Sequence, residues 1–331
     1  MIKDILTLDD NTEVELRVLL IRKDIKKSQR TQGVRLEMEL GDSSGTIKGI
    51  VFDDAENVDS ILSVGKVYSV KGVLGTFNRE RRIVITPSAL SEVPEEDMYS
   101  YLPRSERDIE EMWTELLSLI RSVKNKYMAA LLRYVFIDDR EFSEKFKKAP
   151  AAVFYHQNYV GGLLEHTLKV VNICMVLARE YENINRDLLI TGALLHDIGK
   201  VLEYRIFPLE RTAEGRLLGH IALGYNMVKS KIDNLRSLPG RGFPKILELG
   251  ILHMILSHHG KLEWGSPVVP MTPEALVLHY ADVIDSKMWS VFDKLKEAER
   301  QGDTWTDAIK NLDNIRFFNP SSIKENAEED F

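Results

Sequence analysis

A nine-residue stretch near the middle of the chain, Gly192 to Lys200, constrains fold and chemistry more than any other. An apolar run with helical spacing leads into the adjacent pair His196 and Asp197, and the chain then turns at Gly199. Imidazole offers a metal ion one nitrogen, while a carboxylate offers two oxygens that can bridge two ions. Two ions about 3.5–4 Å apart can hydrolyse phosphate esters. The stretch therefore indicates a metal-dependent hydrolase, although a single His-Asp pair also occurs by chance.

All 8 histidines lie between residues 156 and 279. Taken one at a time, each is better explained as a core or surface residue. Their joint arrangement favours a metal site, because several stand at predicted helix ends, which can direct side chains into a common cavity. Imidazoles with two carboxylates favour borderline divalent metals, so we expect two ions, with Mn²⁺ first and Fe²⁺, Co²⁺, Ni²⁺ or Mg²⁺ as alternatives. The candidate ligands are His166, His196, Asp197, His220, His258, His259 and Asp282.

Three residues are candidates for catalysis. Asp197 is the carboxylate expected to serve both ions. Lys200, one helical turn after His196, is expected to neutralise a phosphate oxygen in the transition state. The alternative for Lys200 is a cation stabilised by a helix C-terminus. His156 is expected to contact the terminal nucleotide or the leaving oxygen, or else to be an exposed loop residue. His279, within an apolar helical pattern, is kept as a reserve ligand only.

The N-terminal part of the chain has strand periodicity. Hydrophobic alternation and turn residues predict five short strands, at residues 13–23, 33–41, 46–52, 66–75 and 82–86. A short helix is expected near 54–64, between the third and fourth strands. This order is typical of an OB-fold, so residues 1–90 are predicted to form an all-β OB-fold barrel.

Basic and aromatic residues gather at the two loops through which OB-folds usually contact nucleic acids. A cationic groove with stacking rings is what single-stranded binding requires. Each loop alone is better explained as a solvated charge run at a hairpin tip, whereas both together favour binding of single-stranded RNA, or of single-stranded DNA. The candidate contacts are Lys23, Lys26, Lys27, Arg30, Arg35, Phe52, Phe77, Arg79 and Arg81.

The remainder of the chain is helical. Residues 91–105 are acidic and contain prolines, which predicts a linker, and residues 106–318 have helical periodicity throughout. The polar segment 319–331 is predicted to be a disordered acidic tail. The fold class is therefore multidomain, with an all-β barrel followed by an all-α domain.

Composition limits the setting of the protein. The single Cys174 excludes a disulfide within the chain, no secretory signal is visible, and no apolar run approaches the length of a membrane span. These features predict a cytoplasmic protein without membrane contact. The net charge of −7, taken over the whole chain, argues against a nucleic-acid partner. The basic side chains are nevertheless concentrated locally, near two loops of the predicted barrel. The oligomeric state stays open, and a homo-oligomer is compatible with the sequence.

The order of the motifs resembles a known superfamily. GGLLEHT at 161–167, HDIGK at 196–200 and SHHG at 257–260 follow the pattern of HD-domain metal-dependent phosphohydrolases. With a β-rich segment in front, the chain is similar to the YhaM family of 3′-to-5′ exoribonucleases. The resemblance implies one ion held by His166, His196, Asp197 and Asp282. It implies a second held by His220, His258 and His259, with Asp197 bridging.

The predicted function is a metal-dependent exonuclease that shortens single-stranded RNA, or DNA, to nucleoside 5′-monophosphates. The 3′-to-5′ direction and the RNA preference are implied by the resemblance alone. One alternative is a phosphohydrolase of a small nucleotide, such as a nucleoside triphosphate, an alarmone or a cyclic dinucleotide. The signature of HD-GYP enzymes is incomplete here, and a basic OB-fold would have no evident purpose in such an enzyme. A non-catalytic binding protein is disfavoured, because every ligand type is present.

Overall fold

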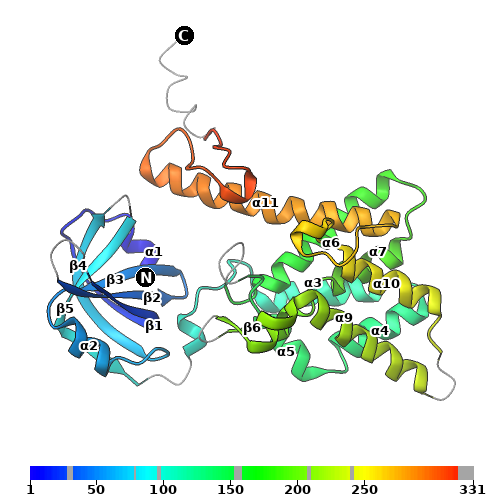
Figure 1. Cartoon of the computed structure of the whole chain (residues 1–331), viewed down its shortest axis with the longest axis horizontal. Helices are drawn as coiled ribbons and strands as arrows, with labels where there is room; N and C mark the ends of the chain where they lie inside the picture. Colours follow the sequence, from blue (N-terminus) through cyan, green and yellow to red (C-terminus); the bar gives the residue numbers. More distant parts are fainter. Residues whose placement is uncertain are drawn as a thin grey trace, which may run out of the picture. The chain divides into compact units, whose positions relative to one another are not determined.

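The computed structural model describes residues 1–27, 33–77, 80–94, 98–152, 159–206, 210–238 and 242–319. The chain divides into two compact units. The first comprises Met1–Glu106 with Arg205–Glu210, and the second comprises Arg107–Tyr204 with Arg211–Phe331. Strands dominate the first unit and helices the second (Figure 1).

The first unit is a closed five-stranded barrel, in which the strands follow the order β1-β2-β3-β5-β4. A short helix α2 (Ala55–Ile61) separates β3 from β4, and a single turn α1 (Ile2–Ile5) precedes β1. This architecture confirms the predicted OB-like barrel. The strands are β1 (Glu13–Lys27), β2 (Val34–Asp42), β3 (Gly45–Val51), β4 (Val67–Phe77) and β5 (Glu80–Val93), and a 3₁₀ turn η1 (Met98–Tyr101) follows.

The barrel closes because β1 is long enough to serve two neighbours. Its first half pairs antiparallel with β4 and its second half with β2, and a β-bulge between Leu20 and Arg22 lies within the pairing with β2. A bulge bends and twists a strand, which lets a sheet curl. Alternating residues Leu16, Val18 and Leu20 point into the core. A parallel pairing of β3 with β5 completes the ring.

Two strands are longer than the sequence pattern predicts. β1 continues to Lys27 instead of ending at residue 23, so Lys26 pairs with Arg35 and lies within the sheet. β5 runs from Glu80 to Val93 instead of covering 82–86. The shorter prediction took Pro87 as the end of the strand, but Pro87 falls where the β4–β5 ladder shifts register between Val70 and Gly72, and the strand continues past it.

The second unit is a bundle of helices around one apolar core. α6 contacts α7 and α11, and α10 contacts α7, α9 and α11. A two-stranded ribbon, β6 (Tyr204–Arg205) with β7 (Glu210–Arg211), also occurs. The helices are α3 (Ile109–Ser122), α4 (Lys126–Phe136), α5 (Arg140–Lys148), α6 (Gly162–Glu180), α7 (Arg186–Leu195), α8 (Lys200–Glu203), α9 (Ala213–Ser237), α10 (Lys245–Ser257) and α11 (Pro273–Gln301), with 3₁₀ turns η2 (Leu262–Trp264) and η3 (Lys310–Leu312).

Side-chain caps define where these helices begin. The Asp108 carboxylate accepts hydrogen bonds from the backbone N–H groups of Glu110 and Glu111, so α3 starts after Asp108. The hydroxyl of Thr272 accepts from Ala275 N at 3.2 Å, as the Thr-Pro pair before α11 predicts. Among the described residues, no helix has both the length and the apolar character needed to cross a membrane.

Candidate metal centre

Five segments of the helical unit bring the candidate ligands together. His166 lies in the first turns of α6, and His196 and Asp197 lie in the turn after α7. His220 follows a break in α9, while the pair His258-His259 ends α10. The last candidate, Asp282, lies within α11.

Close backbone packing sets where His220 stands relative to Asp197. Gly219, directly before His220, has a φ of 71° and a ψ of 158°, which interrupts the helix. A Cβ at Gly199 would lie 2.0 Å from the carbonyl oxygen of His220. Only glycine therefore permits the turn after Asp197 to contact the main chain at His220.

A first group of ligand atoms surrounds His166 Nε2. This nitrogen lies 3.3 Å from Oδ2 of Asp197, 3.2 Å from Oδ1 of Asp282 and 3.3 Å from Nε2 of His196. Two ligand atoms that are each about 2.1 Å from one ion lie about 3–3.5 Å apart. The spacing is therefore suited to a shared metal ion.

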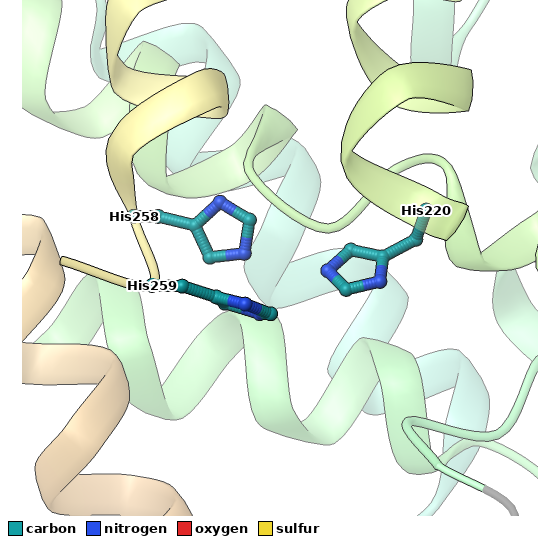
Figure 2. Close-up of side chains that lie close together, drawn as sticks. All are labelled: His220, His258 and His259. Atoms are coloured by element: carbon teal, nitrogen blue, oxygen red, sulfur yellow. The ribbon is translucent and has the colours of Figure 1, made fainter. Parts of the chain in front are cut away.

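A second group lies on the other side of the same carboxylate. Oδ1 of Asp197 is 3.4 Å from Nε2 of His220 and 3.5 Å from Nε2 of His258. Figure 2 shows the rings of His220, His258 and His259 facing a common space. One nitrogen from each of these three rings lies within 4.8 Å of the others. Asp197 therefore offers one oxygen to each group.

Backbone carbonyls fix the tautomer of three of the imidazoles. A carbonyl oxygen can only accept a hydrogen bond, so Nδ1 carries the proton and Nε2 keeps its lone pair. This partner on the second nitrogen is the usual arrangement of metal-binding histidines. The bonds join His196 to Ala193 (2.8 Å), His258 to Ile255 (2.7 Å) and His259 to Trp264 (2.9 Å).

Two carboxylates contact Nδ1 of the remaining imidazoles and orient these rings. Oδ2 of Asp285 is 2.7 Å from Nδ1 of His166, and Oε2 of Glu203 is 3.1 Å from Nδ1 of His220. Our sequence analysis missed both carboxylates. The available signal for Asp285 was its position three residues after Asp282, on a similar face of one helix.

The two groups differ in their electrostatics. Burial lowers the pKa of His220 and of His258, and it lowers the pKa of His259 to about 4, so these rings are neutral at pH 7. Although burial opposes it, the carboxylates of Asp197, Asp282 and Asp285 raise the pKa of His166 well above its usual value. Metal binding at His166 thus displaces a proton, whereas the other three rings already carry a free lone pair.

Some ligand atoms are buried without a hydrogen-bond partner. Within the described part of the chain, this holds for Oδ1 of Asp197 and for Nε2 of His220 and of His258. A buried polar atom without a partner costs about 1–3 kcal/mol, and here three such atoms face one another. The residues fit a divalent cation, which would satisfy all three together.

Lys200 and two further histidines surround the ligands. Nζ of Lys200 is buried and lies 2.6 Å from Oδ2 of Asp197, and this contact raises the pKa of Lys200 against the effect of burial. Nδ1 of His279 donates to the carbonyl of His258 at 2.9 Å. His253 Nε2 accepts from the backbone of Met271. The catalytic candidate His156 lies outside the described residues.

In the barrel, most of the basic candidates are engaged by nearby acids. Lys23 contacts Asp59 at 3.0 Å, Lys26 contacts Asp24 at 2.5 Å and Arg35 contacts Glu37 at 2.6 Å. Arg81 donates to the carboxylate of Asp10 and to the carbonyl of Leu8. Lys27 is exposed, and Arg30 and Arg79 lie outside the described residues.

The aromatic candidates of the barrel are open to solvent. Phe52 is 49% exposed and Phe77 is 54% exposed. The guanidinium carbon of Arg82 stands 4.4 Å from the centre of the Phe77 ring. An exposed ring with a cation on it is a surface on which an unpaired base can stack.

Comparison with known proteins agrees with this site. Residues 163–287 match the HD domain family. The 3′-5′ exoribonuclease YhaM of Geobacillus sp. (strain WCH70) is 30% identical over 92% of this chain and 92% of its own. The protein of the same name from Listeria monocytogenes serovar 1/2a is 30% identical over 97% of this chain and 99% of its own. That from Bacillus pumilus is 31% identical over the same shares.

Among solved structures, a chain of a replication protein A heterotrimer bound to single-stranded DNA has 20% identity and a TM-score of 0.21, covering 32% of this chain and 27% of that one. A TM-score this low is not evidence of a shared fold. The relatives in sequence, by contrast, match over nearly the whole length of both proteins. On these grounds, the chain belongs to the YhaM family of 3′-5′ exoribonucleases and contains the HD domain of that family.

Proposed function

We propose that this protein is a metal-dependent exonuclease that hydrolyses single-stranded RNA from its 3′ end and releases nucleoside 5′-monophosphates. Single-stranded DNA, with the same backbone phosphates, is a second substrate. The proposal extends the nuclease assignment of the family to the substrate and the metal dependence of this chain.

One observation carries the proposal. Asp197 directs Oδ1 and Oδ2 at two different groups of histidines, and the orphaned atoms around Oδ1 are buried. His166, His196, Asp197 and Asp282 would hold one ion, and His220, His258 and His259 would hold a second with Asp197. Divalent ions, when bound, supply Lewis acidity toward the phosphate and a water nucleophile at neutral pH. The donor set favours Mn²⁺, Fe²⁺, Co²⁺ or Ni²⁺ over Mg²⁺.

Lys200 is assigned to the phosphate. Its ammonium lies against Asp197 inside the protein, where an unscreened positive charge interacts strongly with a developing negative charge. In the proposed reaction Lys200 neutralises an oxygen of the scissile phosphate. The same position would also stabilise Asp197 as a carboxylate, whose pKa Lys200 lowers against the effect of burial.

The barrel is assigned to capture of the single strand. Phe52 and Phe77 offer exposed rings, Arg82 offers a cation against the Phe77 ring, and Lys27 offers an exposed cation at the end of β1. Exposed ion pairs such as Lys26 with Asp24 are weak and can be exchanged for contacts with phosphates. Such a surface binds bases through their faces and is therefore tolerant of sequence.

The test uses metal-stripped protein to which Mn²⁺ is returned, with one RNA sequence labelled at either end. A descending ladder from the 5′ label, with the 3′ label released at once as a mononucleotide, is the expected result. An RNA blocked by a 3′-phosphate should resist shortening at its end.

Failure to shorten either RNA with any of the divalent metals would refute the proposal. A panel of nucleoside triphosphates, alarmones and cyclic dinucleotides, offered in parallel, then identifies a small-nucleotide phosphohydrolase as the replacement.

A further inference from the structure

A short segment follows the last two candidate histidine ligands. It runs from Gly260 through η2 to Ser266 and is closed by successive backbone bonds. Trp264 N donates to Lys261 O at 3.1 Å, and Ser266 N donates to Lys261 O at 3.2 Å. The backbone of this segment, residues 260–266, is therefore constrained directly after the candidate ligand His259.

Trp264 is linked to the candidate ligands by one hydrogen bond and, through His279, by a ring contact. Its carbonyl oxygen accepts from Nδ1 of His259 at 2.9 Å, which leaves Nε2 of that ring facing the cluster. Its indole lies beside the His279 ring, with the two ring centres 6.0 Å apart, and His279 in turn donates to the carbonyl of His258. The tight fit of His279 explains Gly260, since a Cβ there would lie 2.1 Å from the imidazole.

The indole is nevertheless open to solvent. Trp264 is 43% exposed, which is unusual for a large apolar ring held this firmly. The ammonium of Lys261 stands 4.5 Å from the centre of the indole. An aromatic face and a cation therefore stand together on a segment that begins at the ligand His259.

We infer that Trp264 is the stacking platform for the base of the 3′-terminal nucleotide and that Lys261 contacts the phosphate of that nucleotide. The inference rests on the proposed function. The terminal phosphodiester must reach the ligands of the cluster, and its base lies only one sugar away from it. Among the described residues, Trp264 is the exposed tryptophan that shares a hydrogen bond with one of those ligands.

Replacing the contact between Lys261 and the indole by a stacked base and a lysine–phosphate contact is favourable. Stacking of a base on an aromatic ring contributes more than an exposed contact between a lysine and the same ring. Lys261 loses its contact with the indole and gains a phosphate, which is a stronger partner for an ammonium group. Because every base has a π-face, such a subsite accepts all four nucleotides.

The experiment is a cycle of enzyme and substrate variants on the Mn²⁺-loaded full chain. The enzymes are wild type, Trp264→Ala and Trp305→Ala. The substrates are two RNAs that differ only at the last residue, which is either adenosine or 1-deoxyribose without a base. Trp305 is the matched control, because it is 49% exposed in the same unit and, within the described part of the chain, packs on Phe318 and not on a candidate ligand.

Removing the terminal base should lower kcat/KM of the wild type by about 5- to 100-fold, mainly through KM. For Trp264→Ala, kcat/KM on the RNA with the terminal base should fall to the value on the RNA without that base. Removal of the base should then change kcat/KM of this variant by less than about twofold. Trp305→Ala should behave as the wild type. Trp264→Phe, which keeps an aromatic ring, should recover most of the discrimination.

Metal content separates a substrate contact from a structural role, because all variants keep the backbone carbonyl that binds His259. Each should retain the metal stoichiometry of the wild type, and Lys261→Met should lower kcat/KM equally on both RNAs. An equal loss by Trp264→Ala on both RNAs, or no loss on either, would overturn the inference while the proposed function stands. If the wild type shortens neither RNA, the proposed function fails and the inference fails with it.

Discussion

On the barrel surface, charged side chains pair with one another in the open, as in Lys48 with Glu80 at 2.6 Å and Lys71 with Glu15 at 3.2 Å. In the centre of the helical unit, polar atoms are buried and several remain unpartnered among the described residues, Oδ1 of Asp197 included. The candidate metal centre therefore differs from these surface pairs. The exposed pairs need little stabilisation and have partners, whereas several buried ligand atoms of the centre need much of it and lack them.

The difference supports the role proposed for each surface. An exposed ion pair contributes about 0–1 kcal/mol, so it is readily exchanged for another charged partner such as a phosphate. An unpartnered buried atom costs about 1–3 kcal/mol, so a cluster of them persists only where something else binds there. The candidate metal centre is distinguished by buried polar atoms that lack hydrogen-bond partners, more than by its number of charged groups.

The largest effect should follow from Asp197→Asn, which keeps the shape of the shared carboxylate and removes its charge. Because both groups of histidines use this side chain, we expect metal content to fall for both ions. RNA hydrolysis should fall by about 10³-fold or more, since several kcal/mol of metal-supplied stabilisation is lost. Elemental analysis and end-labelled RNA measure the two quantities.

Asp138→Asn is the matched control, because Asp138 is an exposed carboxylate that contacts Arg133 at 3.3 Å. It should leave metal content and hydrolysis unchanged. If the Asp197→Asn protein still bound two ions, the buried unpartnered atoms around Asp197 would not mark the metal site.

Removal of metal should destabilise the helical unit and leave the barrel unaffected. At metal concentrations of about 100 to 1,000 times Kd, binding stabilises a fold by about 3–4 kcal/mol, and chelation removes that contribution. Hydrogen exchange read by mass spectrometry should show lost protection in α7 and α10, with β1 and β4 unchanged. Asp197→Asn should show no response to the chelator, and an equal loss of protection in the barrel strands would contradict the prediction.

The two orienting carboxylates should act separately on the two groups. Glu203→Gln should weaken metal binding at the His220 side, and Asp285→Asn should weaken it at the His166 side, each by about 10- to 100-fold. A Mn²⁺ titration that resolves two binding steps measures both. Glu248→Gln is the control, since Glu248 is equally buried but pairs with Arg236 and Lys245 instead of a histidine. If either variant lost both Mn²⁺-binding steps, the two groups of ligands would not bind metal independently.

The smallest effect concerns the barrel. Phe77→Leu should weaken binding of single-stranded RNA by about fivefold, the lower end for loss of one stacked base, because Arg82 already covers part of the ring. Fluorescence anisotropy with a metal-stripped protein isolates binding from hydrolysis. Ile61→Ala removes an equally exposed apolar group from α2 and should have no effect. If Phe77→Leu binds as the wild type does, stacking at this loop is refuted.

Periodicity and motif spacing predicted the two architectures and a set of ligand candidates that the structure brings together. Helix ends could be predicted as the sources of His196 and His258, because the apolar faces before them must pack inward. Glu203 and Asp285 could not be recognised as partners of those rings. Helical spacing shows which residues share a face, but not which imidazole on another helix lies opposite.

The barrel shows the same limit in another form. Arg81 stands in a basic run that is typical of an exposed loop, yet its guanidinium is engaged by Asp10, 71 residues earlier in the chain. The extension of β1 to Lys27 likewise depends on its register with β2. Contacts between segments that are distant in the sequence determine both the pairing of Arg81 and the length of β1. A local sequence pattern carries no information about such contacts.

The glycine after the His-Asp pair has a consequence for how the centre can change. The main chain at Gly199 packs against the main chain at His220, so the distance between the backbones that carry Asp197 and His220 does not depend on side-chain rotamers. An alanine at this position would leave every ligand in the sequence and still push them apart, because neither backbone can yield by rotating. A family member that lost this glycine would thus be expected to keep an intact motif around a centre able to hold only one ion.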